Sequence, residues 1–188
     1  MKQLEKITSL KVKQEKEWSE IFKQFETKNR YSILTTAGEK IYYAQEEHGN
    51  FFIACLRFFL KAFRPFTINI VEQKGLTALK LVKPFCFYFH HINIFDSKGN
   101  FLGKTQRCFS ALRKKYLVFN SEGKEIYKLI GHIFRPRTFK ILNNGKECGK
   151  ILKTADNFGI KFSRELSAKD KSILLGAVFL IDIVYFEK

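Results

Sequence analysis

The sequence contains few of the residues that build small chemical sites or unstructured chains. Its 188 residues include 3 Pro, 11 Gly, 4 Cys, 1 Met and 1 Trp. The low Gly and Pro content excludes a low-complexity chain. Cys55, Cys86, Cys108 and Cys148 lie far apart without a CxxC pair, so we expect neither a zinc site nor a dense disulfide framework. Reduced thiols in a cytoplasmic protein are the expectation.

Motifs of catalysis and secretion are also missing. The chain has no Gly-rich phosphate loop, no GxSxG elbow and no HExxH motif. His90 and His91 would point to opposite faces of a strand. The first residues, MKQLEK, lack the apolar run of a signal peptide. We therefore expect a cytoplasmic protein that performs no covalent chemistry.

Charge of one sign dominates what is present. The formal net charge is +16, and residues 51–153 carry twenty basic and five acidic side chains, a net charge of +15. Phe is also abundant, with 21 copies. A basic, Phe-rich folded body indicates an anionic partner, either a membrane surface or a nucleic acid.

Regularly spaced glycines indicate repeated β-hairpins from residue 31 onward. Gly75, Gly99, Gly123 and Gly145 follow one another at intervals of 24, 24 and 22 residues. Short alternating or β-branched runs flank each of them, as strands flank tight turns. The pattern predicts a mainly β domain over residues 31–188, either an antiparallel barrel or a sandwich.

The first thirty residues have a different period. Trp18, Ile21, Phe22 and Phe25 recur at helical spacing among Lys and Glu. We expect residues 1–30 to form a charged helical lead that either docks on the domain or stays partly loose.

Residues 51–64 also interrupt the hairpin pattern. As a helix, they would carry three cations on one face (Arg57, Lys61 and Arg64) and apolar side chains on the other (Phe52, Cys55, Phe59 and Phe63). A basic amphipathic helix with large aromatics is typical of membrane surfaces, which makes Arg57, Lys61, Arg64, Phe59 and Phe63 candidate lipid-binding residues. The alternative, which we slightly favour, is two strands or a loop packed on the sheet.

The C-terminal residues predict a buried helix over about 168–186. Asp182 is the only charged residue in 172–186, and Ser167 with Asp170 forms a capping box ahead of this stretch. A bilayer span needs about 20 apolar residues, and a central ionisable group is costly there. Fifteen residues with an aspartate favour a protein core over a membrane crossing.

Several strings in register resemble the phospholipid scramblase family. They are YSIL at 31–34, GEKIY at 38–42, RPFT at 64–67, ADNFGI at 155–160 and GAVFLID at 176–182. The resemblance implies a tubby-like fold, in which a closed antiparallel β-barrel encloses a hydrophobic C-terminal helix. It also implies calcium-dependent, bidirectional movement of phospholipids between leaflets. The family's polycysteine acylation stretch is replaced by PFCFYFHH at 84–91, which leaves Cys86 as a possible acylation site.

A calcium loop can be aligned with the residues around Gly159. If Gly159 is the sixth position of an EF-hand-like loop, then Thr154 is the first, Asp156 the third and Glu165 the twelfth, with Asn157 between them. Because only two carboxylates are present, we expect low affinity, about 10⁻⁴ to 10⁻³ M. The alternative, which we favour, is a strand that begins after a turn at residues 156–157.

Taken together, the residues and the resemblance predict a non-enzymatic protein at the periphery of the membrane. Its partner would be an anionic phospholipid surface, and its function transbilayer lipid movement. One alternative is a phosphoinositide- or anionic-lipid-binding module that does not scramble. Another is a nucleic-acid-binding protein, with residues 113–115 and 135–137 on phosphates. No recognition-helix or RNA-binding signature accompanies these cations.

Overall fold

The computed structural model describes residues 2–15, 30–47, 63–111, 113–132, 134–135, 137–155 and 157–186. The strands are β1 (Ser9–Gln14), β2 (Arg30–Thr35), β3 (Lys40–Glu46), β4 (Phe66–Glu72), β5 (Thr77–Lys83), β6 (His91–Asp96), β7 (Phe101–Cys108), β8 (Lys115–Asn120), β9 (Glu125–Gly131), β10 (Thr138–Asn143), β11 (Lys146–Lys153) and β12 (Asn157–Phe162). The helices are α1 (Lys2–Glu5) and α3 (Ala168–Tyr185).

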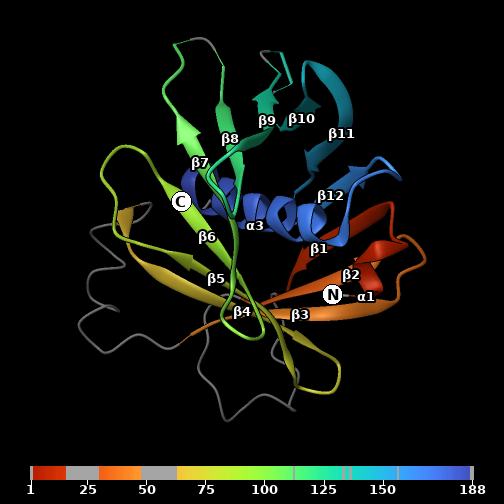
Figure 1. The fold of residues 1–188 in the computed structure, drawn as a ribbon. Helices are drawn as coiled ribbons and strands as arrows, with labels where there is room; N and C mark the ends of the chain where they lie inside the picture. Colours follow the sequence, from red (N-terminus) through yellow and green to blue (C-terminus); the bar gives the residue numbers. More distant parts are fainter. Residues whose placement is uncertain are drawn as a thin grey trace.

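The strands form one closed barrel in which each strand pairs antiparallel with its neighbours in the chain (Figure 1). The barrel closes where β1 pairs with β12, in the register Leu10 opposite Ile160. Closure leaves no unpaired sheet edge among these strands. The mainly β fold, the antiparallel barrel and the enclosed helix predicted above are confirmed.

The hairpin turns lie where the glycine spacing predicts them. Gly99 and Gly123 have φ angles of +84° and +80°, which side chains disfavour. At the first of these turns, an Asp96 carboxylate oxygen accepts hydrogen bonds from the backbone N–H groups of Lys98 (2.8 Å) and Asn100 (2.9 Å). These local interactions fix the turn, and they lie at the end of the barrel that we call the turn end.

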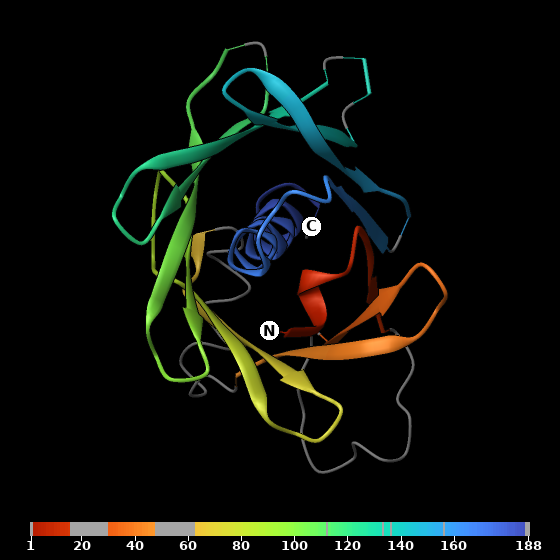
Figure 2. The same cartoon turned by 45° about the vertical axis from the view of Figure 1, so that its right-hand side comes forward.

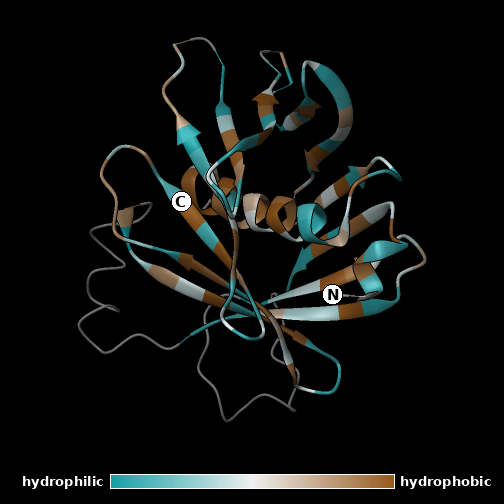
Figure 3. Cartoon of the chain, in the orientation of Figure 1, coloured by the Kyte–Doolittle hydropathy of each residue, from teal (hydrophilic) through white to brown (hydrophobic). Residues whose placement is uncertain are grey.

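Helix α3 runs along the inside of the barrel, and the strands surround it (Figure 2). Its residues 171–183 are buried. The Ser167 hydroxyl accepts a hydrogen bond from the Asp170 N–H at 3.1 Å, as the capping box predicts. Hydrophobic residues dominate the helix and alternate with hydrophilic ones along the strands (Figure 3). Each buried Leu, Ile or Phe side chain contributes about 1.5–3 kcal/mol to this core.

The N-terminal residues differ from the helical lead expected for 1–30. Among the described residues, only Lys2–Glu5 is helical, whereas Ser9–Gln14 is the strand that closes the barrel. Leu10 and Val12 point inward, while Lys11 and Lys13 are exposed. This alternation with period two satisfies a sheet with one buried face. Trp18, Ile21, Phe22 and Phe25, on which the helical prediction rested, lie outside the described residues.

Candidate functional site

Several exposed aromatic side chains gather at the barrel end opposite the turns at Gly99 and Gly123. Strands β5, β7, β9 and β11 end there, and so does α3, whose Tyr185 lines a pocket with the adjoining loops. We call this end the mouth. Its described loop residues are 63–65, 84–90, 109–111, 113–114, 132, 134–135 and 137.

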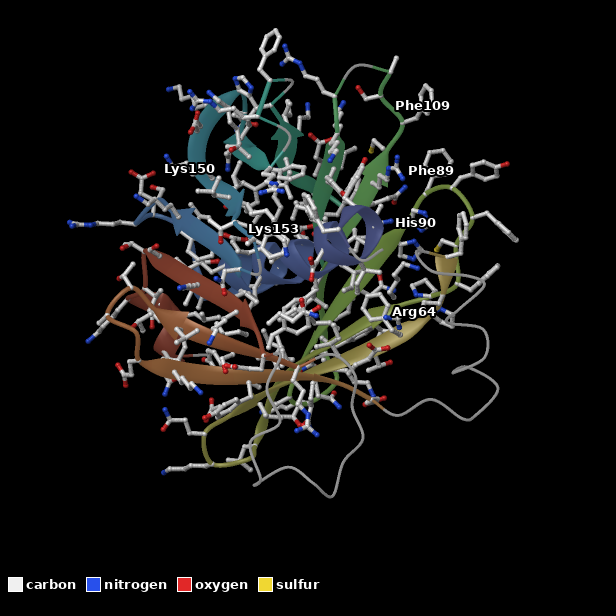
Figure 4. All side chains as sticks on the ribbon, turned by 180° about the vertical axis from the view of Figure 1, so that it is seen from behind. Arg64, Phe89, His90, Phe109, Lys150 and Lys153 are labelled. Atoms are coloured by element: carbon white, nitrogen blue, oxygen red, sulfur yellow. The ribbon has the colours of Figure 1, made fainter. Side chains whose placement is uncertain are left out.

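Aromatic rings at the mouth are exposed to solvent on three separate loops. The exposed fractions are 62% for Phe87, 83% for Tyr88, 57% for Phe89, 88% for Phe109 and 88% for Phe134. Figure 4 shows Phe89 and Phe109 projecting from the same side of the molecule. Exposed apolar groups gathered on one surface indicate an interaction site with a partner or a membrane.

Cations lie among these rings. The Arg107 guanidinium carbon lies 5.0 Å from the centre of the Tyr185 ring, and the Lys114 Nζ lies 4.0 Å from it. Both contacts are within the range of cation–π attraction, so they hold the end of α3 against β7 and the following loop. Arg113 and Arg135 are exposed on the mouth loops that follow β7 and β9. The mouth thus combines aromatic and positively charged groups.

A pocket of about 640 Å³ opens between the loops of the mouth. Its wall combines aromatic rings (Phe63, Phe87, Tyr88, Phe89, Phe109 and Tyr185), polar or small residues (Cys108, Ser110 and Ala111) and basic side chains (His90, Arg107, Arg113 and Lys114). The wall includes no carboxylate among the described residues. The pocket is therefore suited to an anion with apolar substituents.

His90 is the buried polar group of this pocket. It is only 3% exposed, and its Nδ1 has no hydrogen-bond partner within the described chain. Burial, with added repulsion from Lys83, Arg107 and His91, lowers the pKa of His90 to about 4. The imidazole is therefore neutral near pH 7.

Behind His90 lies a buried cation. Lys83 is 1% exposed, and its Nζ donates hydrogen bonds to the carbonyl oxygens of Arg64 (2.9 Å) and Pro84 (3.3 Å). Burial lowers the pKa of Lys83 to about 8, with a further lowering from Arg64, partly opposed by Cys86. The interior behind the pocket therefore holds positive charge at neutral pH.

Arg64 is not on an exposed cationic face, and this corrects the sequence prediction. It is 3% exposed and forms a buried ion pair with Glu46, with Nη2 at 3.4 Å from Oε2 and Nη1 hydrogen-bonded to Oε1. A buried guanidinium needs such a partner, so tertiary pairing with β3 overrides the helical-face argument. Figure 4 shows Arg64 on the same side of the molecule as His90.

Of the other predicted lipid-binding residues, the structure describes Phe63 alone. Its ring is 37% exposed and packs against Phe87 (5.8 Å between centroids) and His90 (5.5 Å), so it belongs to the mouth. Arg57, Phe59 and Lys61 lie outside the described residues. The candidate acylation residue Cys86 is half-buried in the same loop as Phe87, with its Sγ 3.5 Å from His91 Nδ1.

The described residues proposed for calcium lie at the two ends of β12. Thr154 and Asn157 form a tight turn, in which the Thr154 N–H (2.8 Å) and hydroxyl (3.1 Å) both donate to the Asn157 carbonyl oxygen. Glu165 follows the far end of the six-residue strand β12, about 20 Å along an extended chain. Asp156 lies outside the described residues. The strand alternative is therefore the observed conformation, and Glu165 does not approach Thr154 and Asn157.

A buried ion pair joins the end of α3 to the barrel. Lys153 Nζ on β11 lies 3.0 Å from Asp182 Oδ1, and the Tyr31 hydroxyl donates to Asp182 Oδ2 at 3.0 Å. At the turn end, the buried Lys171 Nζ donates to the carbonyl oxygens of Leu4 (3.1 Å) and Glu5 (2.8 Å) in α1. Polar contacts therefore secure α3 near both of its ends.

Sequence reasoning missed most of the mouth. His90 and Arg107 face each other across the β6–β7 hairpin, where the Arg107 N–H donates to the His90 carbonyl oxygen at 2.8 Å, but Tyr185 reaches this pair only from α3. The signal that could have been used was the aromatic run at residues 85–89, which follows a strand without alternating with polar residues. A run of this kind cannot bury all of its rings in one sheet face.

The similarity to known proteins agrees with the fold. The family described as Scramblase matches residues 1–188, which is the whole chain. The chain belongs to the scramblase family. Phospholipid scramblase 1 of mouse is 30% identical over 210 aligned residues, covering 98% of this chain and 63% of that protein. Phospholipid scramblase 2 of Bos taurus is 29% identical, covering 98% of this chain and 70% of that protein.

This member of the family thus spans somewhat less than two thirds of mouse phospholipid scramblase 1. A solved structure of a protein from Arabidopsis thaliana is similar with a TM-score of 0.55 and 9% identity, covering 93% of this chain and 90% of that one. This similarity concerns the fold alone. Across the described ranges, no helix of the scramblase-family chain has the length and apolar character required to cross a membrane.

Proposed function

We propose that this scramblase-family protein binds anionic membrane phospholipids with the mouth of its barrel and takes part in moving phospholipids between leaflets. The observation that supports this proposal most is the gathering of exposed rings on three mouth loops beside Arg107, Arg113 and Lys114. Exposed rings enter the interfacial region of a bilayer, while each nearby cation contributes about 1 kcal/mol at an anionic leaflet. We also propose that the protein lies at the cytoplasmic periphery of the membrane.

Lipid translocation is the more demanding part of the proposal. A headgroup needs a polar path through hydrocarbon, and α3 is enclosed by the barrel and tied to it through Asp182. We therefore expect the purified protein to bind vesicles readily and to exchange lipids between leaflets slowly. Rapid exchange at low protein density, measured with fluorescent lipids, would contradict this expectation.

A calcium contribution is proposed only at the turn that contains Thr154 and Asn157. These residues flank Asp156 in the sequence and supply a hydroxyl and a carbonyl oxygen, whereas Glu165 would take no part. Oxygen ligands suit calcium, but few charged ligands give low affinity. Calcium binding would then be weak and separate from the rings that dock on the bilayer.

The docking proposal is tested by co-sedimentation with vesicles of phosphatidylcholine alone or mixed with phosphatidylserine, at two salt concentrations. The double variant Phe89→Ser/Phe109→Ser should bind anionic vesicles at least tenfold more weakly, because it loses about 1.4 kcal/mol or more of apolar insertion. Leu76→Ser is the matched control, since Leu76 is 65% exposed at the turn end. Equal weakening by both variants would contradict docking through the mouth. Stronger binding to duplex DNA than to vesicles would favour the nucleic-acid alternative.

A further inference from the structure

The mouth pocket has features that a flat membrane-docking surface does not need. A docking surface requires exposed rings and cations, but this pocket also has a volume of about 640 Å³ and a buried imidazole. Buried side-chain nitrogens are normally hydrogen-bonded, and those without a partner call for an explanation. The Nδ1 of His90 is one of these atoms within the described residues.

The charged side chains of the pocket wall are all cations. Arg107 and Lys114 lie on one wall and Arg113 follows the same strand, while Lys83 lies behind His90. Guanidinium groups bind phosphate oxygens with two parallel hydrogen bonds, and ammonium groups add charge. The cation–π contacts of Arg107 and Lys114 use the faces of the Tyr185 and Phe186 rings, and no carboxylate of the described chain pairs with either side chain.

The apolar walls indicate what is attached to the anion. Phe87, Phe89 and Phe109 are each more than half exposed, and they lie around the opening rather than beneath it. An inorganic ion would leave these rings in water, whereas the acyl chains of a lipid would cover them. The volume of about 640 Å³ lies within the usual range of pockets for small molecules.

We propose that the mouth pocket binds the phosphate of one phospholipid molecule and prefers headgroups without an ammonium group, of the phosphatidic acid class. An ammonium group would lie among Arg107, Arg113 and Lys114 with no carboxylate of the described wall to balance it. The phosphate sits between these cations, on the pocket wall to which His90 also belongs. This inference rests on the proposed docking function, because docking brings the mouth to the lipid.

Short-chain lipids test the pocket without a bilayer. The full chain is titrated with dihexanoyl phosphatidic acid, dihexanoyl phosphatidylcholine or inorganic phosphate, and binding is followed by calorimetry. Both lipids are kept below their critical micelle concentrations. We expect dihexanoyl phosphatidic acid to bind at least tenfold more tightly than either of the others. Equal or tighter binding of the phosphatidylcholine would overturn the headgroup preference. Equal binding of inorganic phosphate would overturn the assignment to a lipid.

Two variants and one control locate the binding. Arg107→Gln and the exposed Arg113→Gln should each weaken binding of dihexanoyl phosphatidic acid at least fivefold. Lys104→Gln is the matched control, because Lys104 is on the same strand as Arg107 and lies 5.0 Å from the Phe119 ring, outside the pocket. Thermal unfolding verifies that each variant is folded. If both single variants, Arg107→Gln and Arg113→Gln, are folded and bind dihexanoyl phosphatidic acid as the wild type does, the proposed site is wrong.

The two proposals can fail separately. If the wild-type chain binds anionic vesicles and no short-chain lipid, the pocket proposal is wrong and the docking proposal stands. If it binds dihexanoyl phosphatidic acid and no anionic vesicle, the pocket stands as a soluble-ligand site and the docking function is wrong.

Discussion

Lys153 and Asp182 form an ion pair with 3.0 Å between Nζ and Oδ1, and both side chains are at least nine-tenths buried. The pair connects the wall of the barrel to the helix inside it, and the Tyr31 hydroxyl completes the site. Lys153 Nζ also lies 4.2 Å from the centre of the Phe158 ring. The position of α3 in the barrel thus depends on a charged contact as well as on apolar packing.

Removing one partner of this pair should destabilise the fold strongly. We expect Lys153→Met to lower the free energy of unfolding by about 3–5 kcal/mol, because Asp182 is left charged and buried. The double variant Lys153→Met/Asp182→Leu should recover much of the loss. Urea denaturation measures both. Lys140→Met breaks the exposed pair with Glu147 (2.8 Å) and should cost less than about 1 kcal/mol. Equal losses in Lys153→Met and Lys140→Met would show that burial does not strengthen the contact.

Gly176 of α3 should not accept a methyl group, although alanine favours helices. A Cβ at this position would lie 2.7 Å from Ile94 Cγ1 on β6. Overpacking of this kind costs about 1–3 kcal/mol, which exceeds the gain of about 1 kcal/mol in helix propensity. We expect Gly176→Ala to lower the melting temperature. Ile94→Ala should be less damaging in the Gly176→Ala background than in the wild type, and additive effects would contradict the close approach.

The stability of the fold should decrease in mild acid because of His90. Its pKa is lowered to about 4, whereas an unfolded chain takes up the proton near pH 6.5. Between these values only the unfolded state is protonated, so stability is complete above about pH 6.5 and falls as the pH approaches 4. The loss is at most about 3 kcal/mol. Denaturation of His90→Gln at several pH values should show a smaller slope in this window, while His91→Gln serves as the control.

Calcium should bind weakly, and Glu165 should not affect it. Calorimetric titration is expected to give a dissociation constant no tighter than about 10⁻⁴ M, because few charged ligands are present. The Glu165→Gln variant should give the same value, since β12 separates Glu165 from the turn at Thr154 and Asn157. Micromolar affinity that Glu165→Gln abolishes would require a rearranged loop and would refute this expectation.

Local signals explain how much of the fold could be predicted. The turns at Gly99 and Gly123 and the cap at Ser167 each depend on a few neighbouring residues, so the sequence reveals them directly. Strand β1 also carried its signal, the alternation of Leu10 and Val12 with lysines, but helical spacing farther along the chain outweighed it. A short alternating run can therefore form a strand even beside a stronger helical pattern.

The site was less predictable because it depends on closure of the barrel. Arg64 had the spacing of a helix face, yet its partner Glu46 comes from another strand and draws it into the interior. Likewise, Tyr185 meets the hairpin partners His90 and Arg107 only after the sheet has closed around α3. Such contacts join residues that are far apart in the chain, and neither composition nor periodicity predicts which of these residues meet.

The pairing of β1 with β12 means that the barrel can close only late in translation. Strand β1 leaves the ribosome early, but its second neighbour is among the last parts of the barrel to be translated. Until then the nascent chain exposes two open sheet edges and an unfilled apolar lumen, both of which invite aggregation. We expect the protein to fold late and slowly. Its yield should depend on chaperones that cover the incomplete barrel until α3 has been synthesised.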